Sequence, residues 1–166
     1  MRFGRKREPE PPAEAYTRLR EQILGLTAEQ LNDAYADAPL LALAMDMGYP
    51  EGAATLIGVV DGASSLYFSN GGGIIGAGEH ATVAEANRRL LEAGRGLLHE
   101  LAAISSAPLP EEGMTQFVAV TPGGLRGASA PEQELGGGGH ALSPLFYAAQ
   151  DVITQIRLLP EANQRG

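Results

Sequence analysis

Two glycine-rich segments, each followed by a histidine, are the residues whose pattern could bind a ligand. The first follows an apolar stretch and the second precedes an amphipathic one. Glycine lets a backbone approach a ligand closely, and N–H groups near a helix N-terminus attract anions. The pattern therefore indicates a site for a small anion or a nucleotide. Its candidate residues are Asn70, Gly71, Gly72, Gly73, Gly76, His80, Gly138, Gly139 and His140.

The first glycine segment matches a known phosphate-binding pattern by letter only. Gly71-x-Gly73-x-x-Gly76 has the spacing of the dinucleotide fingerprint. That fingerprint requires a βαβ unit, whereas the strand expected before Gly71 belongs to a hairpin. The segment also lacks the Lys-Ser/Thr ending of a P-loop. We therefore favour a turn that carries the chain from a sheet to a helix.

A hydrolase is a further possibility, with Ser69 or Ser143 as nucleophile and His80 or His140 as base across one cleft. Neither serine lies in a Gly-x-Ser-x-Gly elbow. Ser143, followed by a proline, is already explained as a helix N-cap. We therefore assign no catalytic residue. The chain has no cysteine and three histidines, so we expect neither a metal nor another cofactor.

The remaining polar candidates favour ordinary structural roles. His99 is expected to be solvated on a helix, and Asp46 to point to solvent from an otherwise apolar strand. If Asp46 were buried, it would need a partner and would become a site candidate. The glutamates around Glu111-Glu112 and Glu132–Glu134 indicate solvated loops.

The N-terminal half is predicted to contain two helices and three strands. A helix opened by Pro12 has an apolar stripe and ends at Gly25, and the capping-box spacing from Thr27 to Gln30 predicts a second helix reaching about Ala36. Asp61-Gly62 predicts a tight hairpin. The strands are expected over Leu40–Met47, Thr55–Val60 and Ser64–Ser69.

The C-terminal half is predicted to contain two long helices and a hairpin. The first helix spans about Glu79 to Ala103, with a Glu85–Arg89 pair and with Gly94 and Gly96 as points of close packing on the sheet. Strands over Thr115–Val120 and Leu125–Ala130 precede a last amphipathic helix from Ser143 to Pro160. The fold class is therefore α+β, with a mostly antiparallel five-stranded sheet packed with helices, in the order α-α-β-β-β-α-β-β-α.

Charge divides the 166-residue chain into a basic leader and an acidic body. The formal net charge is −8, and Arg2, Arg5, Lys6 and Arg7 place four positive charges in the first seven residues. An acidic body repels phosphate backbones, so no nucleic acid is expected as a partner. We predict a disordered, proline-rich tail over 1–12, one globular domain over 13–160 and a frayed end over 161–166. The tail could tether weakly to anionic surfaces, but no membrane span is expected, and the location predicted is cytoplasmic.

The stretches Leu66–Gly76 and Leu142–Arg157 resemble an uncharacterised family of small bacterial proteins, over roughly Thr55 to Leu159. The order of elements is also loosely similar to Roadblock/LC7-type and longin-like modules, which are small scaffolds that serve regulatory GTPases. These resemblances assign no activity. Our prediction is a non-catalytic interaction or regulatory module that binds a protein partner or forms a homodimer. The alternative is the anion or nucleotide site described above.

Overall fold

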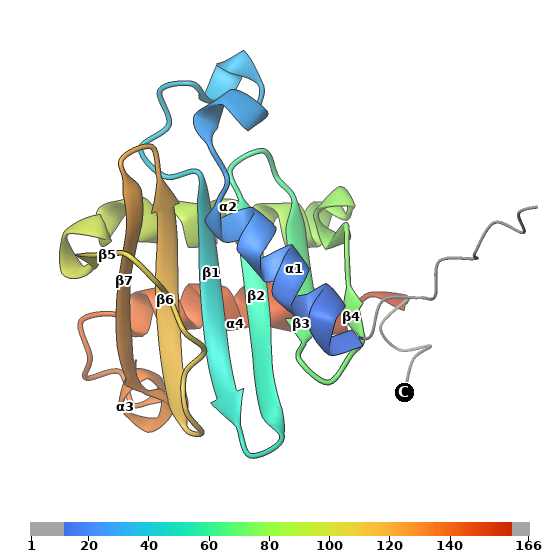
Figure 1. Cartoon of the computed structure of the whole chain (residues 1–166), viewed down its shortest axis with the longest axis vertical. Coiled ribbons are helices and arrows are strands. Elements are labelled where there is room, and N and C mark those ends of the chain that lie inside the picture. The colour runs from blue at the N-terminus through green and yellow to red at the C-terminus, as the bar shows by residue number, and fades with distance from the viewer. Residues whose placement is uncertain (1–11, 161–166) are drawn as a thin grey trace, which may run out of the picture.

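A single antiparallel sheet with helices on both faces organises the computed structural model, which describes residues 12–160 (Figure 1). The strand order is β4-β3-β2-β1-β6-β7-β5, and all neighbouring strands are antiparallel. The α+β class is therefore confirmed. The strands are β1 Ala42–Tyr49, β2 Gly52–Val59, β3 Ser64–Phe68, β4 Gly73–Ile74, β5 Ala102–Ile104, β6 Met114–Thr121 and β7 Gly124–Pro131.

The sheet has seven strands, not the five that the sequence pattern predicted. All five predicted strands are present with boundaries shifted by a few residues. The additional strand β4 lies inside the first glycine segment, where glycine φ values allow the chain to fold back on β3. The other, β5, occupies residues expected to be helical and pairs with β7. The predicted tail and the frayed end fall largely outside the described residues.

Helix α2 (Ala81–Gly96) is shorter than predicted because the chain turns after Gly96. A short 3-10 turn over Leu98–Glu100 follows, and the chain then enters β5. The close packing expected at Gly94 is confirmed, since a Cβ there would lie 3.0 Å from Leu40 Cδ2. Gly96 instead faces open space at the helix end. Glycine is a poor helix former, so Gly96 is a favourable place for α2 to end. The turn that follows buries Leu101 in the core.

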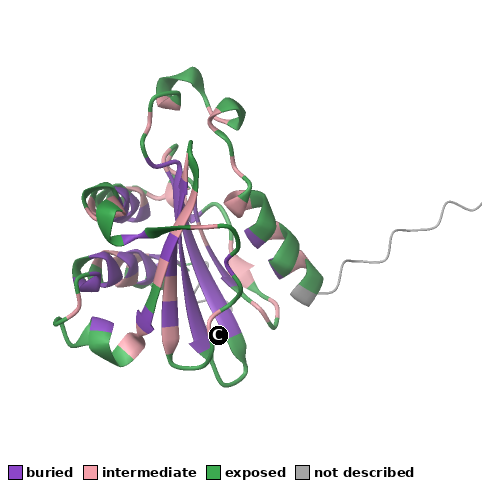
Figure 2. Cartoon of the chain, turned by 60° about the vertical axis from the view of Figure 1, so that its left-hand side comes forward, coloured by how far each residue is buried: buried purple, intermediate pink, exposed green. Residues whose placement is uncertain are grey.

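The main core lies between the sheet and the helices α2 and α4 (Ser143–Arg157), as Figure 2 shows nearly edge-on. The inward face predicted for the last helix is confirmed. Its members are all buried: Leu145, Phe146, Ala149, Val152, Ile153, Ile156 and Leu159. The outward side carries charged and polar groups instead. On α2, Arg88 pairs with Glu85 and Glu92. Arg89 of α2 approaches Asp151 of α4 rather than the predicted Glu85.

The opposite face of the sheet carries α1 (Pro12–Leu24) and a second, smaller apolar cluster. Its inward residues include Tyr16, Leu19 and Ile23, as the helical spacing predicted. The segment from 105 to 113 has no regular structure and covers the same face beside α1. None of the helices within residues 12–160 has the length and hydrophobicity needed to span a bilayer.

Two predictions about short helical segments are wrong. The second helix is replaced by two 3-10 turns, Ala28–Gln30 and Asp33–Tyr35. The Asn32 side chain accepts a hydrogen bond from the Ala34 N–H and so starts a new turn, an alternative to helix that asparagine favours. The loop expected at Glu132–Glu134 instead forms the short helix α3 (Glu132–Gly136), because Leu135 packs into the core.

Candidate functional site

Asp46 lies in a row of polar residues that crosses the α1 face of the sheet. It pairs in register with Thr55 on β2 and with Gln116 on β6. Its exposed fraction is 0%, so the favoured prediction of a solvent-facing Asp46 is wrong. Helix α1 covers this row, and a buried carboxylate of this kind must have partners. The network around Asp46 is therefore the first site candidate.

Four hydrogen bonds fill the acceptor positions of the Asp46 carboxylate. Oδ1 accepts from Arg20 Nε at 3.1 Å and from Thr55 Oγ1 at 2.6 Å. Oδ2 accepts from Arg20 Nη2 at 2.7 Å and from Gln116 Nε2 at 3.1 Å. A threonine hydroxyl has one proton, which here goes to Asp46, so the Tyr16 phenol donates to Thr55 Oγ1.

The same network ties the covering segments to the sheet. Arg20 Nη2 donates to the Ala107 carbonyl at 2.6 Å, and Gln116 Nε2 donates to the Pro108 carbonyl at 3.1 Å. Helix α1 and the 105–113 segment are thus held by one buried carboxylate. Because each oxygen of Asp46 already accepts two hydrogen bonds, the cluster offers a substrate no acceptor position. Its geometry is that of a structural clamp.

The charges of the clamp support one another. Burial opposes the charge on Arg20, but the hydrogen bonds and attraction of Asp46 outweigh it and raise the pKa of the guanidinium. Burial also raises the pKa of the Tyr16 phenol, and the nearby charge of Asp46 raises it further. Tyr16 is therefore held in its neutral, donating form.

We expect Tyr16→Phe to weaken the loss of stability at alkaline pH. A folded-state pKa raised above the unfolded value of about 10 contributes stability that is present below pH 10 and is lost as the pH rises toward the folded pKa. The free energy of unfolding should therefore fall less steeply in the variant above about pH 10. Urea titrations of both proteins across this range measure it, and parallel curves would contradict the assignment. Burial also raises the pKa of Tyr49, so this residue contributes part of the alkaline pH dependence of stability that stays in the variant.

The first glycine segment forms a tight hairpin between β3 and β4. The Gly71 N–H donates to the Phe68 carbonyl at 3.0 Å, and the Phe68 N–H donates to the Gly72 carbonyl at 3.2 Å. Gly71, Gly72 and Gly73 all have positive φ values, of 106°, 86° and 150°. This backbone requires glycine for folding, independently of any ligand. The hairpin also lacks the helix that a dinucleotide site places directly after its strand.

The second glycine segment is closed by its own hydrogen bonds. The Gly138 N–H donates to the Leu135 carbonyl at 3.3 Å, and the His140 N–H donates to Ser143 Oγ at 3.2 Å. His140 Nδ1 accepts from the Leu142 N–H at 3.0 Å, and the Tyr147 hydroxyl donates to the Gly136 carbonyl at 2.8 Å. The His140 ring and the Tyr147 hydroxyl therefore hold the second glycine segment together.

Ser143 does not act as the predicted N-cap through its side chain. Its hydroxyl is buried and donates to the Leu135 carbonyl at 2.8 Å, so it closes the glycine segment instead. The capping position belongs to Leu142, whose carbonyl accepts the Phe146 N–H at 3.0 Å. The His140 N–H donates to the hydroxyl oxygen at 3.2 Å and so takes an acceptor position that a cap would offer to the helix N–H groups.

The structure does not bring the two histidines together. His80 lies in a depression with Ile75, Gly76 and Leu159, beyond the C-terminal end of α4. His140 precedes the first residue of the same helix, whose 15 residues span about 22 Å. Ser69 Oγ, in turn, accepts the Ala53 N–H at 2.8 Å. No shared cleft therefore joins the two glycine segments, and the predicted serine–histidine pairs are not formed.

The remaining candidates are Asn70, at the start of the first glycine segment, and His99. Asn70 lines a depression with Tyr49, Glu51, Phe68 and Arg157. His99 is exposed, as predicted, with Nε2 at 3.4 Å from Glu100 Oε1. Within residues 12–160, no group of three histidine, aspartate or glutamate side chains is arranged to hold a metal ion.

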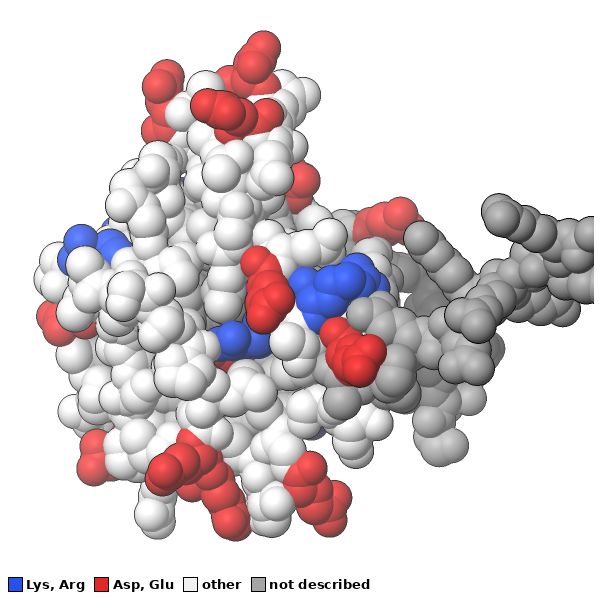
Figure 3. All heavy atoms as spheres, in the orientation of Figure 1, with Lys and Arg blue, Asp and Glu red and all other residues white. Residues whose placement is uncertain are grey.

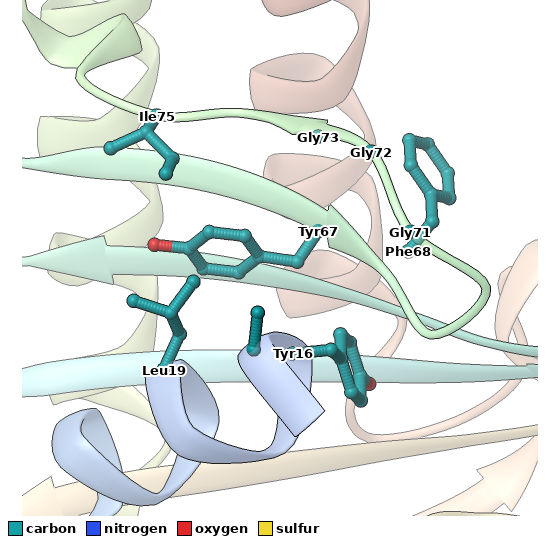
Figure 4. Close-up of a pocket in the computed structure, with 9 residues that line it drawn as sticks. Tyr16, Leu19, Tyr67, Phe68, Gly71, Gly72, Gly73 and Ile75 are labelled. Carbon is teal, nitrogen blue, oxygen red and sulfur yellow. The ribbon is translucent and has the colours of Figure 1, made fainter. Parts of the chain in front are cut away.

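An apolar groove runs between α1 and the β3–β4 hairpin (Figure 4). The Tyr67 ring lies along it, Leu19 flanks it from the helix, and Ile75 stands at its rim with 69% of its surface exposed. Among residues 12–160, no charged side chain lines it. The sequence pattern indicated the inward stripe of α1 but gave no sign that a hairpin would lie beside it. The full lining is Ala15, Tyr16, Leu19, Tyr67, Phe68, Gly71, Gly72, Gly73 and Ile75.

Exposed apolar side chains gather around this end of the sheet. Of the six large exposed hydrophobic residues among 12–160, Phe68 and Ile75 line the groove, and Tyr49 lines the neighbouring depression with Arg157 of α4. Phe68 lines both the groove and the depression of Tyr49 and Arg157, and Leu158 follows Arg157 directly. We call the groove together with Tyr49, Phe68 and Ile75 the edge surface. On the face that Figure 3 shows, acidic side chains lie at the top and bottom, and others lie beside basic side chains near the middle.

Comparisons of the chain with protein-family models, with curated proteins and with solved structures find no match.

Proposed function

We propose that this chain is a non-catalytic interaction module that binds protein through the edge surface. The observation that carries the proposal is the apolar groove between α1 and the β3–β4 hairpin, with the exposed side chain of Ile75 at its rim and the exposed Phe68 and Tyr49 in the adjoining depression. Contiguous exposed apolar surface of this kind is typical of interaction sites. The described residues that line the groove are all uncharged, which suits apolar side chains of a polypeptide better than a phosphate or a carboxylate.

The contacts of the glycine segments favour this function over anion binding. Several of their backbone N–H groups already donate within their own turns. The two segments also lie toward opposite ends of α4, so they cannot act on one small ligand. The clamp around Asp46 likewise uses its polar groups internally. The exposed apolar side chains of the edge surface therefore support protein binding better than the glycine segments support anion binding.

Peptide selection followed by NMR mapping tests the proposal. Peptides selected from a random library against the immobilised protein should shift the backbone amides of Leu19, Tyr67 and Ile75. Ile75→Glu should abolish the binding, because a charge would be buried against the apolar lining. Leu109→Glu is the matched control, since Leu109 is 43% exposed and does not line the groove. Binders that map elsewhere, or none at all, would contradict the proposal.

A further inference from the structure

We infer that Asn70 is a site of spontaneous deamidation, at which the folded protein converts the side-chain amide into aspartate and isoaspartate. Of the four asparagines in the chain, only Asn70 is followed by glycine. Glycine has no Cβ, so its backbone nitrogen can approach the side-chain carbonyl carbon of the preceding residue closely. The reaction requires no partner protein and therefore does not depend on the proposed function.

The Asn70 side chain is open to the reaction. It is exposed and borders a depression of the surface, so water can reach it and ammonia can leave. Its amide has no hydrogen-bonding partner among residues 12–160. The amides of the other two described asparagines are held in place. Oδ1 of Asn32 accepts the Ala34 N–H at 3.1 Å. Asn87 is buried, and its Nδ2 donates to the Val59 carbonyl at 3.2 Å.

The conversion proceeds through a cyclic imide. The Gly71 nitrogen loses its proton and attacks Cγ of Asn70, and the side-chain nitrogen takes up a proton and leaves as ammonia. Water then adds to one of the two carbonyl carbons of the imide. Cleavage of the bond between the Gly71 nitrogen and Cγ gives aspartate. Cleavage of the bond to the main-chain carbonyl carbon gives isoaspartate, in which Gly71 stays attached to Cγ.

The β3–β4 hairpin restrains the reacting nitrogen only weakly. The Gly71 N–H donates to the Phe68 carbonyl at 3.0 Å, and this hydrogen bond opposes the loss of the proton. However, β4 has two residues and pairs with β3 at two positions. So short a pairing at the edge of the sheet can open while the rest of the protein stays folded. We therefore expect the reaction to occur in the native state.

Isoaspartate at position 70 should disrupt the hairpin. It lengthens the main chain inside the turn, where the Phe68 carbonyl accepts the Gly71 N–H and the Phe68 N–H donates to the Gly72 carbonyl. The pairing of β4 with β3 begins directly after this turn. The hairpin also forms one wall of the apolar groove (Figure 4), so the modification changes the edge surface as the protein ages.

Peptide mapping by mass spectrometry, during incubation of the full chain at mildly alkaline pH, tests the inference. Asn70 should convert at least about tenfold faster than Asn32, which is also exposed but is followed by aspartate. The rate should rise with pH, because the attacking nitrogen must lose a proton. In water labelled with heavy oxygen, the product should carry the label at residue 70. Asn70→Gln is the matched control, since glutamine would have to close a larger ring and should stay unchanged.

Hydrogen exchange of the aged protein tests the effect on the hairpin. The isoaspartate form should exchange the amides of β4 faster than the fresh protein, while the Asn70→Gln variant aged in parallel should not. Isoaspartate without faster exchange would contradict the disruption of the hairpin. An Asn70 amide that persists while Asn32 converts, or conversion only in urea, would overturn the inference. So would aspartate as the only product, because direct hydrolysis of the amide gives no isoaspartate. None of these results affects the peptide test, which uses the fresh protein.

Discussion

Asp46→Ala should lower the free energy of unfolding by about 3–5 kcal/mol, the usual effect of removing one partner from a buried ion pair. Arg20 is only 8% exposed, and the substitution leaves its guanidinium buried beneath α1 without a negative partner. It also removes the oxygen atoms to which Thr55 and Gln116 donate hydrogen bonds. Chemical denaturation monitored by circular dichroism measures the change. Because α1 and the 105–113 segment share this clamp, both should gain hydrogen-exchange rate.

Two companion variants make the result specific. Asp151→Ala removes the partner of Arg89 in a surface pair at 3.6 Å and should change stability by no more than about 1 kcal/mol. Replacing Arg20 and Asp46 together by methionine and leucine should recover much of the loss, because no unpaired charge then stays buried. A small effect of Asp46→Ala, or no recovery in the double variant, would contradict the role of Asp46 as the centre of the clamp.

Gly48→Ala should destabilise the protein by about 1–3 kcal/mol through overpacking. A Cβ at Gly48 would lie 2.0 Å from the Glu111 carbonyl oxygen and 2.8 Å from that of Pro110. These are backbone atoms, so the whole 105–113 segment must move to make room. The Gly113 N–H also donates to the Gly48 carbonyl at 3.1 Å and would be displaced with it. Thermal unfolding of the variant measures the loss.

Gly96→Ala is the matched control, with the opposite sign. A Cβ at Gly96 would have no atom within 4 Å beyond its own helix and chain neighbours, and the residue ends α2 with an ordinary backbone. Alanine in a helix is favoured over glycine by roughly 0.5–1 kcal/mol, so the variant should be more stable. Equal effects at the two positions would show that the 105–113 segment does not rest on Gly48.

Local signals predicted the parts of this fold in which neighbouring residues decide the outcome. The spacing of apolar residues located the buried face of α4. Asp61-Gly62 located the β2–β3 hairpin, although its loop has three residues, 60 to 62, instead of the predicted two, and only Gly62 has a positive φ. The same reasoning failed at β5, where a strand formed only because the edge of β7 was available to pair with it.

The sequence by itself therefore determined the α+β class, the five main strands and the helix faces, since backbone preferences and periodicity are properties of short stretches. Only the tertiary structure decided that Asp46 is buried beneath Arg20, residues 26 positions apart in the chain. The tertiary structure also places His80 and His140 apart, and it places Ile75 beside the groove next to α1. Those relations depend on which strand and which helix come together across the whole chain, and no local pattern specifies them.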